Sequence, residues 1–573
     1  MPSQKMENQL RMALELPESV RQETLDLDTG FSEEEDTWTV IVRYVGDIDR
    51  LETGGITITK LLGGFAVVTL PAGRIDAFAV EPEIIYMEKP KRLNFAVAQG
   101  KRSACFAQVS DPPENLTGEG VLIGIVDSGL DFFHDDFRNS DGTTRLAAYW
   151  DQTGEGRPPR GYRRGRLYTE EEINALLAGE EESVRAGLDA SGHGTAVAGI
   201  AAGNGRGQEN GQAGAAPGSR ILAVKLGTPG SRSFPRTTEL MTGVDFLVRM
   251  AQEMGMPIAV NISFGNNYGS HSGDSLMASY LNVAADYGRT VICIGTGNEG
   301  ELARHASSVW EEDVPEVTEL SVSEYQTSFN LQLWKDYEDR TALVIVHPDN
   351  RRYVLIEGDP GLQERRLGQT DVLIYYGQPA PYSMQQELYI EFIPRDSYVD
   401  EGVWKIVAYP YRIIRGEHDY WLPSGDGVQA GTIFLKPDPE RTMTEPSPAA
   451  MCIAVAAYNS VTQVYAPFSG RGYPRQTALI HPVLAAPGVN ILTSRAGGGQ
   501  ITVTGTSFAT PFVTGAAALL MEWGIVRGND PYLYGQKVKA YLISGARRIP
   551  SEREYPNPRV GFGVLCVGDS LPG

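Results

Sequence analysis

The sequence predicts an α/β protein built on a doubly wound parallel sheet, with a small α+β domain before it and an all-β insertion within it. Continuous apolar segments of strand length alternate with amphipathic helical segments, which is typical of a parallel sheet covered on both faces. Short alternating segments in the first 90 residues indicate a small antiparallel sheet. A longer series of such segments between residues 310 and 440 indicates a β-sandwich.

The N-terminal region predicts the small α+β domain. Residues 37–44, 56–61, 65–70 and 84–88 have the pattern of strands, and residues 72–80 have that of a helix. We expect an antiparallel sheet of these four strands with helical cover on one face. The irregular residues 89–118 have the character of a linker.

The α/β pattern begins with the apolar strand 121–126 and resumes at 451–457, after the β-rich insertion. Between these two strands, the segments 221–225, 258–265 and 290–295 alternate with helical segments at 238–254 and 275–287. We therefore divide the chain into an N-terminal domain (1–96), two parts of the α/β domain (97–309 and 441–573) and a jelly-roll-like insertion (310–440).

The composition excludes some classes of function. The net charge of −22 argues against a nucleic-acid-binding protein. The four cysteines lack metal-ligand spacing, and so few in 573 residues suggest a reducing compartment; they are Cys105, Cys293, Cys452 and Cys566. The N-terminus has no apolar signal segment, and no segment approaches the length that crosses a bilayer. We expect a cytoplasmic protein, or one enclosed in a spore, with no membrane partner.

A basic cluster lies in the polar segment after the first apolar strand. Its five arginines are suited to contact an acidic partner, but an acidic run at 180–182 follows, so we favour a solvated loop; they are Arg157, Arg160, Arg163, Arg164 and Arg166.

Three short motifs lie where a predicted strand ends or a predicted helix begins: Asp127-Ser128-Gly129, Gly192-His193-Gly194-Thr195 and Gly505-Thr506-Ser507. A serine becomes a nucleophile only beside a base, and a histidine serves as that base when a carboxylate orients it. The carboxyl ends of parallel strands meet at one edge of a sheet, so distant residues can converge there. Taken alone, the Ser507 segment is equally well explained as a capped core helix.

A fourth motif, Gly297-Asn298-Glu299-Gly300, follows another predicted strand, and an asparagine there is suited to donate to an oxyanion. Together the four motifs resemble those of subtilases, the subtilisin-like serine proteases. The resemblance implies that Asp127 orients His193, which acts as general base and then acid. It also implies that Ser507 is the nucleophile, and that Asn298 and the Ser507 N–H form the oxyanion hole.

The resemblance also implies a substrate cleft. Ser263, Phe264 and Gly265 would form one wall, and Leu226 and Gly227 the opposite wall. A protein or peptide substrate would bind between them as an extended strand. The alternative for each segment is a plain strand end.

Subtilases commonly carry an N-terminal α+β prodomain that acts as chaperone and inhibitor. The chain's own prodomain is therefore an expected partner, and residues 93–100 contain the expected scissile bond. The prodomain, the missing signal segment and the two insertions are similar to the Csp germination proteases of anaerobic spore formers, which activate a cortex-lytic zymogen by limited cleavage. The alternatives are a catalytically silent signalling or scaffold protein on this fold, and a general intracellular degradative subtilisin.

We expect no metal or cofactor in the site. The family leaves calcium open, because Asp136 matches a carboxylate that ligates calcium in secreted subtilisins. One carboxylate does not make a calcium site, so we interpret Asp136 as a surface or capping residue.

Overall fold

The structure is a computed structural model of the chain. It describes residues 5–6, 10, 14, 31–32, 36–61, 65–88, 103–179, 182–208, 211–227, 235, 237–354, 361–376, 379, 383–425, 428–474 and 479–572. It contains two compact units, Met1–Asn94 and Phe95–Gly573. The expected cleavage segment, 93–100, lies outside the described residues.

The first unit is the predicted small α+β fold. Strand β2 (Thr37–Tyr44) pairs antiparallel with β4 (Phe65–Pro71), and β4 pairs with β3 (Thr57–Leu61). Strands β1 (Phe31–Ser32) and β5 (Ile84–Glu88) pair with different stretches of β2, and the helix α3 covers Ile75–Ala79. Alternate residues of β2 are buried because one face of the sheet carries the core: Trp38, Val40 and Val42.

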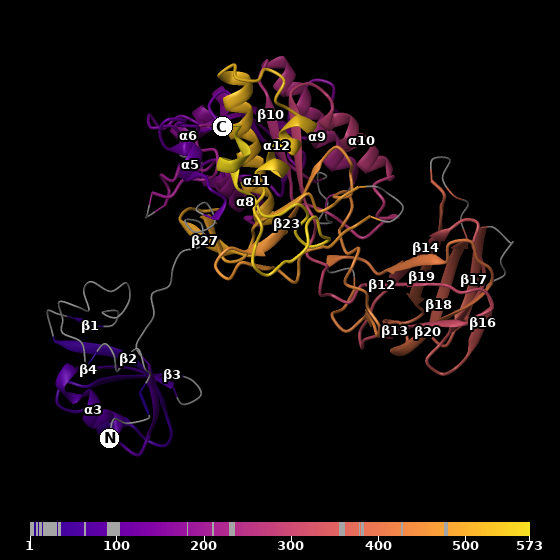
Figure 1. Ribbon diagram of the computed structural model, residues 1–573, viewed down its shortest axis with the longest axis horizontal. Coiled ribbons are helices and arrows are strands. Elements are labelled where there is room, and N and C mark those ends of the chain that lie inside the picture. Colours follow the sequence, from indigo (N-terminus) through magenta and orange to yellow (C-terminus); the bar gives the residue numbers. More distant parts are fainter. Residues whose placement is uncertain are drawn as a thin grey trace. The chain divides into compact units, whose positions relative to one another are not determined.

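The second unit contains the predicted parallel sheet (Figure 1). Its strand order is β24-β23-β11-β10-β6-β9-β7-β8, with β25 beside β23. All neighbouring pairs are parallel except β7 with β8 and β23 with β24. The strands are β6 (Leu122–Asp127), β7 (Leu146–Asp151), β8 (Arg166–Thr169), β9 (Arg220–Lys225), β10 (Ile258–Ile262), β11 (Thr290–Gly295), β23 (Ile453–Asn459), β24 (Val464–Tyr465) and β25 (Leu484–Pro487).

Helices cover both faces of this sheet because its strands are apolar on both sides. In β6, Ile123 and Ile125 belong to the core shared with α8 (His193–Ala202) and α11 (Thr506–Met521). Leu122 and Val126 belong to the opposite core, with α9 (Thr237–Glu253) and α10 (Leu276–Ala285). The remaining helices are α5 (Ala107–Ser110), α6 (Glu170–Gly179), α7 (Glu182–Leu188), α12 (Gln536–Ser544) and α13 (Val567–Ser570).

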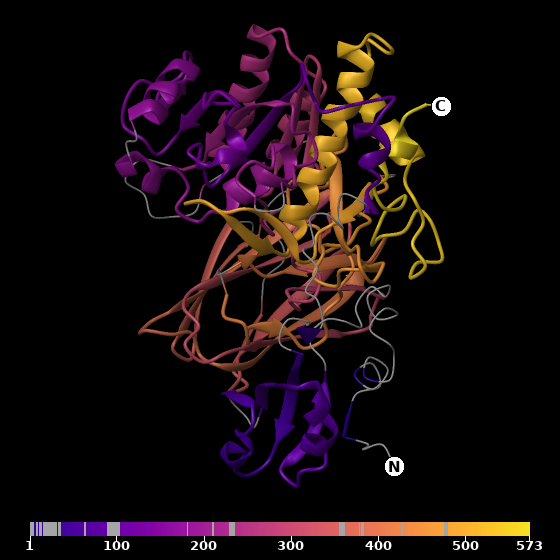
Figure 2. The same ribbon diagram turned by 90° about the vertical axis from the view of Figure 1, so that its left-hand side faces the viewer.

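The central helix α11 belongs to a helical stretch that is long and apolar enough to cross a membrane, although we expected no such segment. The helical stretch Thr506–Val526 has 21 residues and a mean hydropathy of 1.3, enough in length and composition to cross a membrane. However, 83% of its apolar window is buried inside the protein, where it packs along the sheet (Figure 2). Burial in the core accounts for its apolar character.

The β-rich insertion forms two antiparallel sheets around a core of its own. Their orders are β12-β21-β14-β19-β18-β17 and β16-β15-β20-β13-β22. Phe392 of one sheet meets Trp404 of the other at 5.1 Å between ring centroids. The strands are β12 (His305–Val309), β13 (Glu316–Val322), β14 (Phe329–Asp336), β15 (Arg340–Val346), β16 (Arg352–Val354), β17 (Gly361–Leu367), β18 (Thr370–Tyr376), β19 (Gln385–Pro394), β20 (Gly402–Arg412), β21 (Glu417–Trp421) and β22 (Ile433–Phe434). The jelly-roll topology itself stays a prediction.

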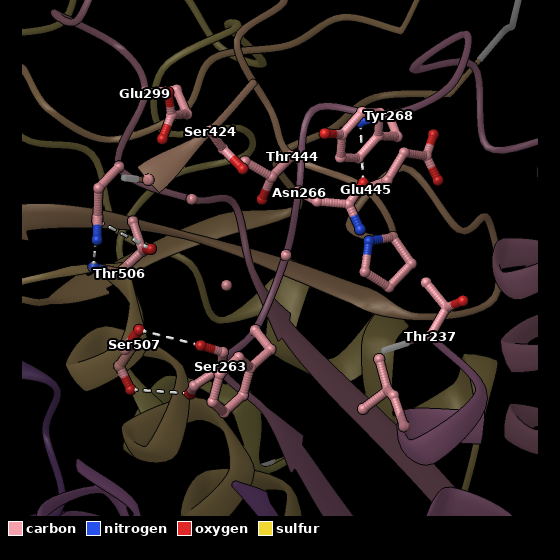
Figure 3. A pocket seen from close by; sticks show the side chains of 18 of the residues that line it. Thr237, Ser263, Asn266, Tyr268, Glu299, Ser424, Thr444, Glu445, Thr506 and Ser507 are labelled. Atoms are coloured by element: carbon pink, nitrogen blue, oxygen red, sulfur yellow. Dashed lines mark hydrogen bonds between the residues drawn. The ribbon is translucent and has the colours of Figure 1, made fainter. Parts of the chain in front are cut away.

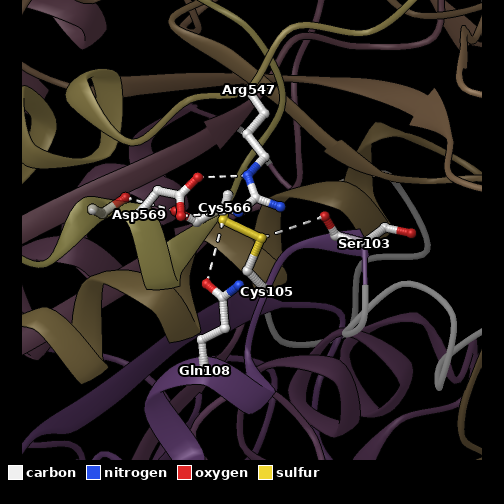
Figure 4. The surroundings of a disulfide bond; sticks show 7 residues. Ser103, Cys105, Gln108, Arg547, Cys566 and Asp569 are labelled. Carbon is white, nitrogen blue, oxygen red and sulfur yellow. Dashed lines mark hydrogen bonds and ion pairs between the residues drawn. A yellow bond between two sulfur atoms is a disulfide. The ribbon is translucent and has the colours of Figure 1, made fainter.

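A disulfide joins Cys105 to Cys566, 461 residues apart in sequence (Figure 4). The sequence did not reveal this pairing, and the expected reducing compartment stays a prediction. Cys293 and Cys452 are free and buried, as the apolar context of Cys293 indicated. The disulfide fastens the start of the second unit to α13, where Val567 N also donates to Ala104 O at 3.0 Å.

Candidate active site

The acid–base half of the site is a buried carboxylate paired with a histidine. Asp127 ends β6 and is fully buried, and His193 begins α8. The imidazole Nδ1 of His193 donates to Asp127 Oδ1 at 2.7 Å. Burial disfavours the imidazolium, but the neighbouring carboxylate favours it more strongly, so the pKa of His193 lies above its ordinary value. This geometry is that of an oriented general base.

A second buried carboxylate, Asp189, holds these two elements together. Its Oδ1 accepts from Ser128 Oγ at 2.8 Å, and its Oδ2 accepts from Thr195 N at 2.8 Å and from Thr195 Oγ1 at 2.6 Å. Because Ser128 follows Asp127 and Thr195 lies in the first turn of α8, Asp189 fixes the strand end against the helix start. Our sequence analysis missed this residue. The available signal was an acidic side chain just before a helix start, where first-turn N–H groups need acceptors.

Ser507 is the second residue of α11, and two hydrogen bonds tie it to the neighbouring strand end (Figure 3). Its Oγ donates to Ser263 O at 3.3 Å, and Ser263 Oγ donates to Ser507 O at 3.1 Å. In a regular helix the N–H of residue 511 would donate to Ser507 O, but Pro511 has no N–H. The proline therefore leaves this carbonyl available to the cleft wall.

The structure does not join Ser507 to His193 by a hydrogen bond between the described residues. The imidazole of His193 instead packs against two aromatic rings, Phe508 at 5.2 Å and Phe264 at 6.0 Å between centroids. A serine hydroxyl has three staggered positions about χ1, so Ser507 Oγ can leave Ser263 O without a backbone movement.

Asn298 lies beside the start of α11, and its amide is oriented by that helix. Its Oδ1 accepts from Thr506 N at 3.0 Å and from Thr506 Oγ1 at 3.2 Å. Because Thr506 holds Oδ1, the two Nδ2 donors of the exposed Asn298 are available to an acceptor other than Thr506. Gly505, just before this helix, has φ +155°, a backbone conformation that residues with a Cβ rarely adopt, so glycine suits this position.

A cavity of about 690 Å³ lies on the side of Ser507 and Asn298. Ser507 and Asn298 line it together with four of the five predicted cleft residues, Ser263, Phe264, Gly265 and Leu226. Gly227 is not among its lining residues.

Two carboxylates that the sequence analysis did not single out also line this cavity. Glu299 pairs with Arg304 at 3.8 Å, and burial raises its pKa. Glu445 is fully buried, accepts from Ser275 Oγ at 2.9 Å, and burial raises its pKa to about 7. Glu299 directly follows Asn298 in the fourth motif, but its burial in the cavity wall, like that of Glu445, depends on the fold and is visible only in the structure.

We expected Asp136 to be a surface or capping residue, but it is fully buried. Its Oδ1 accepts from Gly207 N at 2.9 Å, and its Oδ2 accepts from Gln208 Nε2 and Ser494 Oγ at 3.1 and 2.5 Å. Protein donors thus occupy the oxygens that calcium would need, and no group of three potential metal ligands occurs in the described part of the chain. The residues present do not fit a calcium site at Asp136.

A doubly wound sheet that brings an Asp–His pair and a helix-borne serine to one edge defines a site of the subtilisin-like serine protease class. The model of the subtilase family matches residues 118–375 and 430–563, more than half of the chain. The chain therefore belongs to the subtilase family. The model of the Csp protease B prodomain matches residues 4–91.

Similar proteins agree with this assignment. The structure of the CspB protease of Clostridium perfringens is 34% identical, with a TM-score of 0.76, and the match covers 82% of this chain and 96% of that chain. The minor extracellular protease Vpr of Bacillus subtilis is 24% identical over 89% of this chain, which spans 60% of the length of Vpr. The serine protease AprX of the same species is 30% identical over 23% of this chain and 32% of its own.

Proposed function

We propose that this chain is a serine endopeptidase that removes its own prodomain and then activates a protein zymogen by limited cleavage during spore germination. The observation that carries the proposal is the Asp127–His193 pair at 2.7 Å beside a cavity lined by Ser507. The match of residues 4–91 to a Csp protease B prodomain supports the germination role. A location in the cytoplasm or spore is part of the proposal.

In the proposed mechanism, Ser507 Oγ turns from Ser263 O toward His193 when a peptide enters the cleft. His193 Nε2 takes the hydroxyl proton as Oγ attacks the scissile carbonyl, and Asp127 stabilises the resulting imidazolium. Asn298 Nδ2 and the Ser507 N–H donate to the oxyanion of the tetrahedral intermediate. His193 then protonates the leaving amine, and water releases the acyl group from Ser507 by the reverse sequence.

Two features support cleavage of the chain at its own prodomain. The first compact unit ends at Asn94, within the expected scissile segment 93–100. The disulfide between Cys105 and Cys566 lies on the far side of that segment, so the new N-terminus would stay tied to the second unit. Cleavage there would separate the two units without releasing the start of the protease domain.

Intact mass and N-terminal sequencing test the proposal on wild type and Ser507→Ala. Wild type is expected to lose a fragment that ends within residues 93–100, and Ser507→Ala to keep its full mass. Ser424→Ala, which removes another serine that lines the cavity, serves as the matched control and should process normally. Full processing of Ser507→Ala would overturn the proposal.

Labelling with a serine-reactive phosphonate separates the protease from a silent scaffold. Processed wild type should be labelled, and Ser507→Ala should not. Absence of labelling in folded, processed wild type would favour the scaffold. Digestion of an unfolded protein mixture separates limited from degradative proteolysis, since only a degradative enzyme would cleave it broadly.

A further inference from the structure

The loop between β7 and β8, residues 152–165, lies at the same sheet edge as the active site. Strand pairing places Asp127 opposite Lys225, and Lys225 opposite Asp151. Asp151 in turn lies opposite Arg166, where the loop ends. Neighbouring strands are about 4.8 Å apart, so three pairings put Arg166 roughly 14 Å from Asp127.

The base of this loop contacts the wall of the cleft. Gln152 N donates to Lys225 O at 3.0 Å, and Gln152 Oε1 accepts from Gly227 N at 3.3 Å. Leu226, between these two residues, lines the cavity that contains Ser507. A polypeptide bound along this wall therefore runs next to the loop.

The backbone of the loop is fixed by contacts with the sheet and with α9. Trp150 Nε1 donates to Arg164 O at 3.1 Å, and Leu167 N donates to Arg157 O at 2.9 Å. The Tyr162 ring packs on Trp150 at 4.7 Å, and its hydroxyl donates to Asp245 at 2.7 Å. The loop thus holds its shape before any partner binds.

The loop carries more positively than negatively charged side chains. The side chains of its four arginines are exposed, and none forms an ion pair with another described residue; they are Arg157, Arg160, Arg163 and Arg164. Arg166, at the loop's end, lies over the Tyr168 ring at 4.4 Å. Four arginines against the single carboxylate of Glu155 give the loop a local excess of positive charge in a chain of net charge −22.

We propose that this arginine loop (residues 152–165) is a docking surface for an acidic segment of the protein substrate, beside the segment that is cleaved. The inference rests on the proposed protease function. Guanidinium groups bind carboxylates through paired hydrogen bonds, and a preorganised backbone lowers the entropic cost of binding them. The loop would thereby select an acidic substrate that the cleft alone does not distinguish. This replaces the interpretation of the cluster as a merely solvated loop.

Binding of a fluorescein-labelled octaglutamate peptide to the full Ser507→Ala chain tests the docking surface without requiring catalysis. The variant Arg157→Gln/Arg160→Gln/Arg163→Gln/Arg164→Gln should bind it at least about tenfold more weakly at low salt. The control Arg351→Gln/Arg352→Gln/Arg365→Gln/Arg366→Gln changes the charge equally on the β-sandwich and should bind normally. Octaglutamine should not bind. Equal binding by the two four-fold variants, no binding of octaglutamate, or stronger binding of an oligothymidylate would overturn the inference.

Cleavage kinetics of two peptides test whether binding at the arginine loop assists cleavage at Ser507. A quenched fluorescent peptide of residues 93–100 is compared with the same peptide extended by six glutamates. The extension should raise kcat/KM about tenfold for wild type and less than twofold for the loop variant, and salt should abolish the gain. An equal gain in both proteins would contradict the docking surface. Failure of wild type to cleave either peptide would count against the protease function, while the octaglutamate measurement still decides the docking surface.

Discussion

The two halves of the active site differ in how far they are prepared for catalysis. On one side, Asp127 and His193 are hydrogen-bonded at 2.7 Å, and Asp189 fixes the elements that carry them. On the other, Ser507 donates to Ser263 O rather than to the imidazole. The difference teaches that the base is preorganised by buried charges, whereas the nucleophile must still rotate. The proposed catalytic cycle therefore begins with a side-chain movement.

Removing the charge behind the base should have the largest effect. Asp127→Asn is expected to lower kcat by about 10⁴-fold, because the histidine loses both its tautomer and the stabilisation of its imidazolium. His193 must be neutral to act as base, and Asp127 raises its pKa. The acid limb of kcat/KM in wild type should therefore lie above the ordinary histidine pKa of about 6.5, and in the variant it should lie lower.

Steady-state kinetics between pH 5 and 9 measure both effects. Asp371→Asn on β18 of the β-sandwich is the control and should keep its rate and its acid limb. A variant of Asp127 that keeps a tenth of the wild-type rate would contradict the assigned role.

On the nucleophile side, Asn298→Ala should lower kcat by about 10²–10³-fold with little change in KM, because its amide acts only on the developing oxyanion. Thr506→Val removes one of the two donors that orient the amide and should cost less. Kinetics on a peptide substrate check both variants. An increase in KM at unchanged kcat would show that Asn298 only binds substrate.

Asp189→Asn should lower kcat/KM about tenfold, because it weakens the contacts that hold Asp127 and His193 in place. A tenfold loss corresponds to about 1.4 kcal/mol, the order of one hydrogen bond. Its charge also raises the pKa of His193, so the acid limb should move to lower pH. That shift distinguishes a positioning residue from one that only stabilises the fold. An unchanged acid limb, with only reduced thermal stability, would reject the positioning role.

Glu445 provides a prediction about stability rather than about catalysis. Its pKa is about 7 in the folded state against 4.5 ordinarily, so the folded protein binds the proton more tightly. The contribution of Glu445 to the free energy of unfolding is fully present below pH 4.5 and is lost as the pH rises through 7. Urea unfolding of Glu445→Gln should show a smaller fall in stability between pH 5 and 8 than wild type, by roughly 3 kcal/mol. Identical pH profiles would contradict this assignment.

Local sequence patterns predicted the regular elements closely. The apolar strand before Asp127 and the helix that begins at Ser507 lie where their patterns placed them, within two residues. At the start of α6, the local pattern Thr169-x-x-Glu172 forms a capping box, with Thr169 N donating to Glu172 Oε2 at 2.9 Å. These features depend on neighbours along the chain, so the sequence contains the information.

Interactions between distant segments were beyond the sequence. The Cys105–Cys566 disulfide, the three hydrogen-bonded partners of the buried Asp136 carboxylate and the contacts of Asp189 depend on which loops meet.

The sequence by itself determined the α/β fold class, the small α+β unit and the identity of the candidate catalytic residues, because strand periodicity, helix starts and short motifs are local properties. The tertiary structure alone decided how those residues are oriented. Whether Ser507 Oγ points to His193 or to Ser263 O depends on a strand end 244 residues away and on the carbonyl that Pro511 leaves free. Hydrogen bonds over such separations are set by the packing of the whole domain.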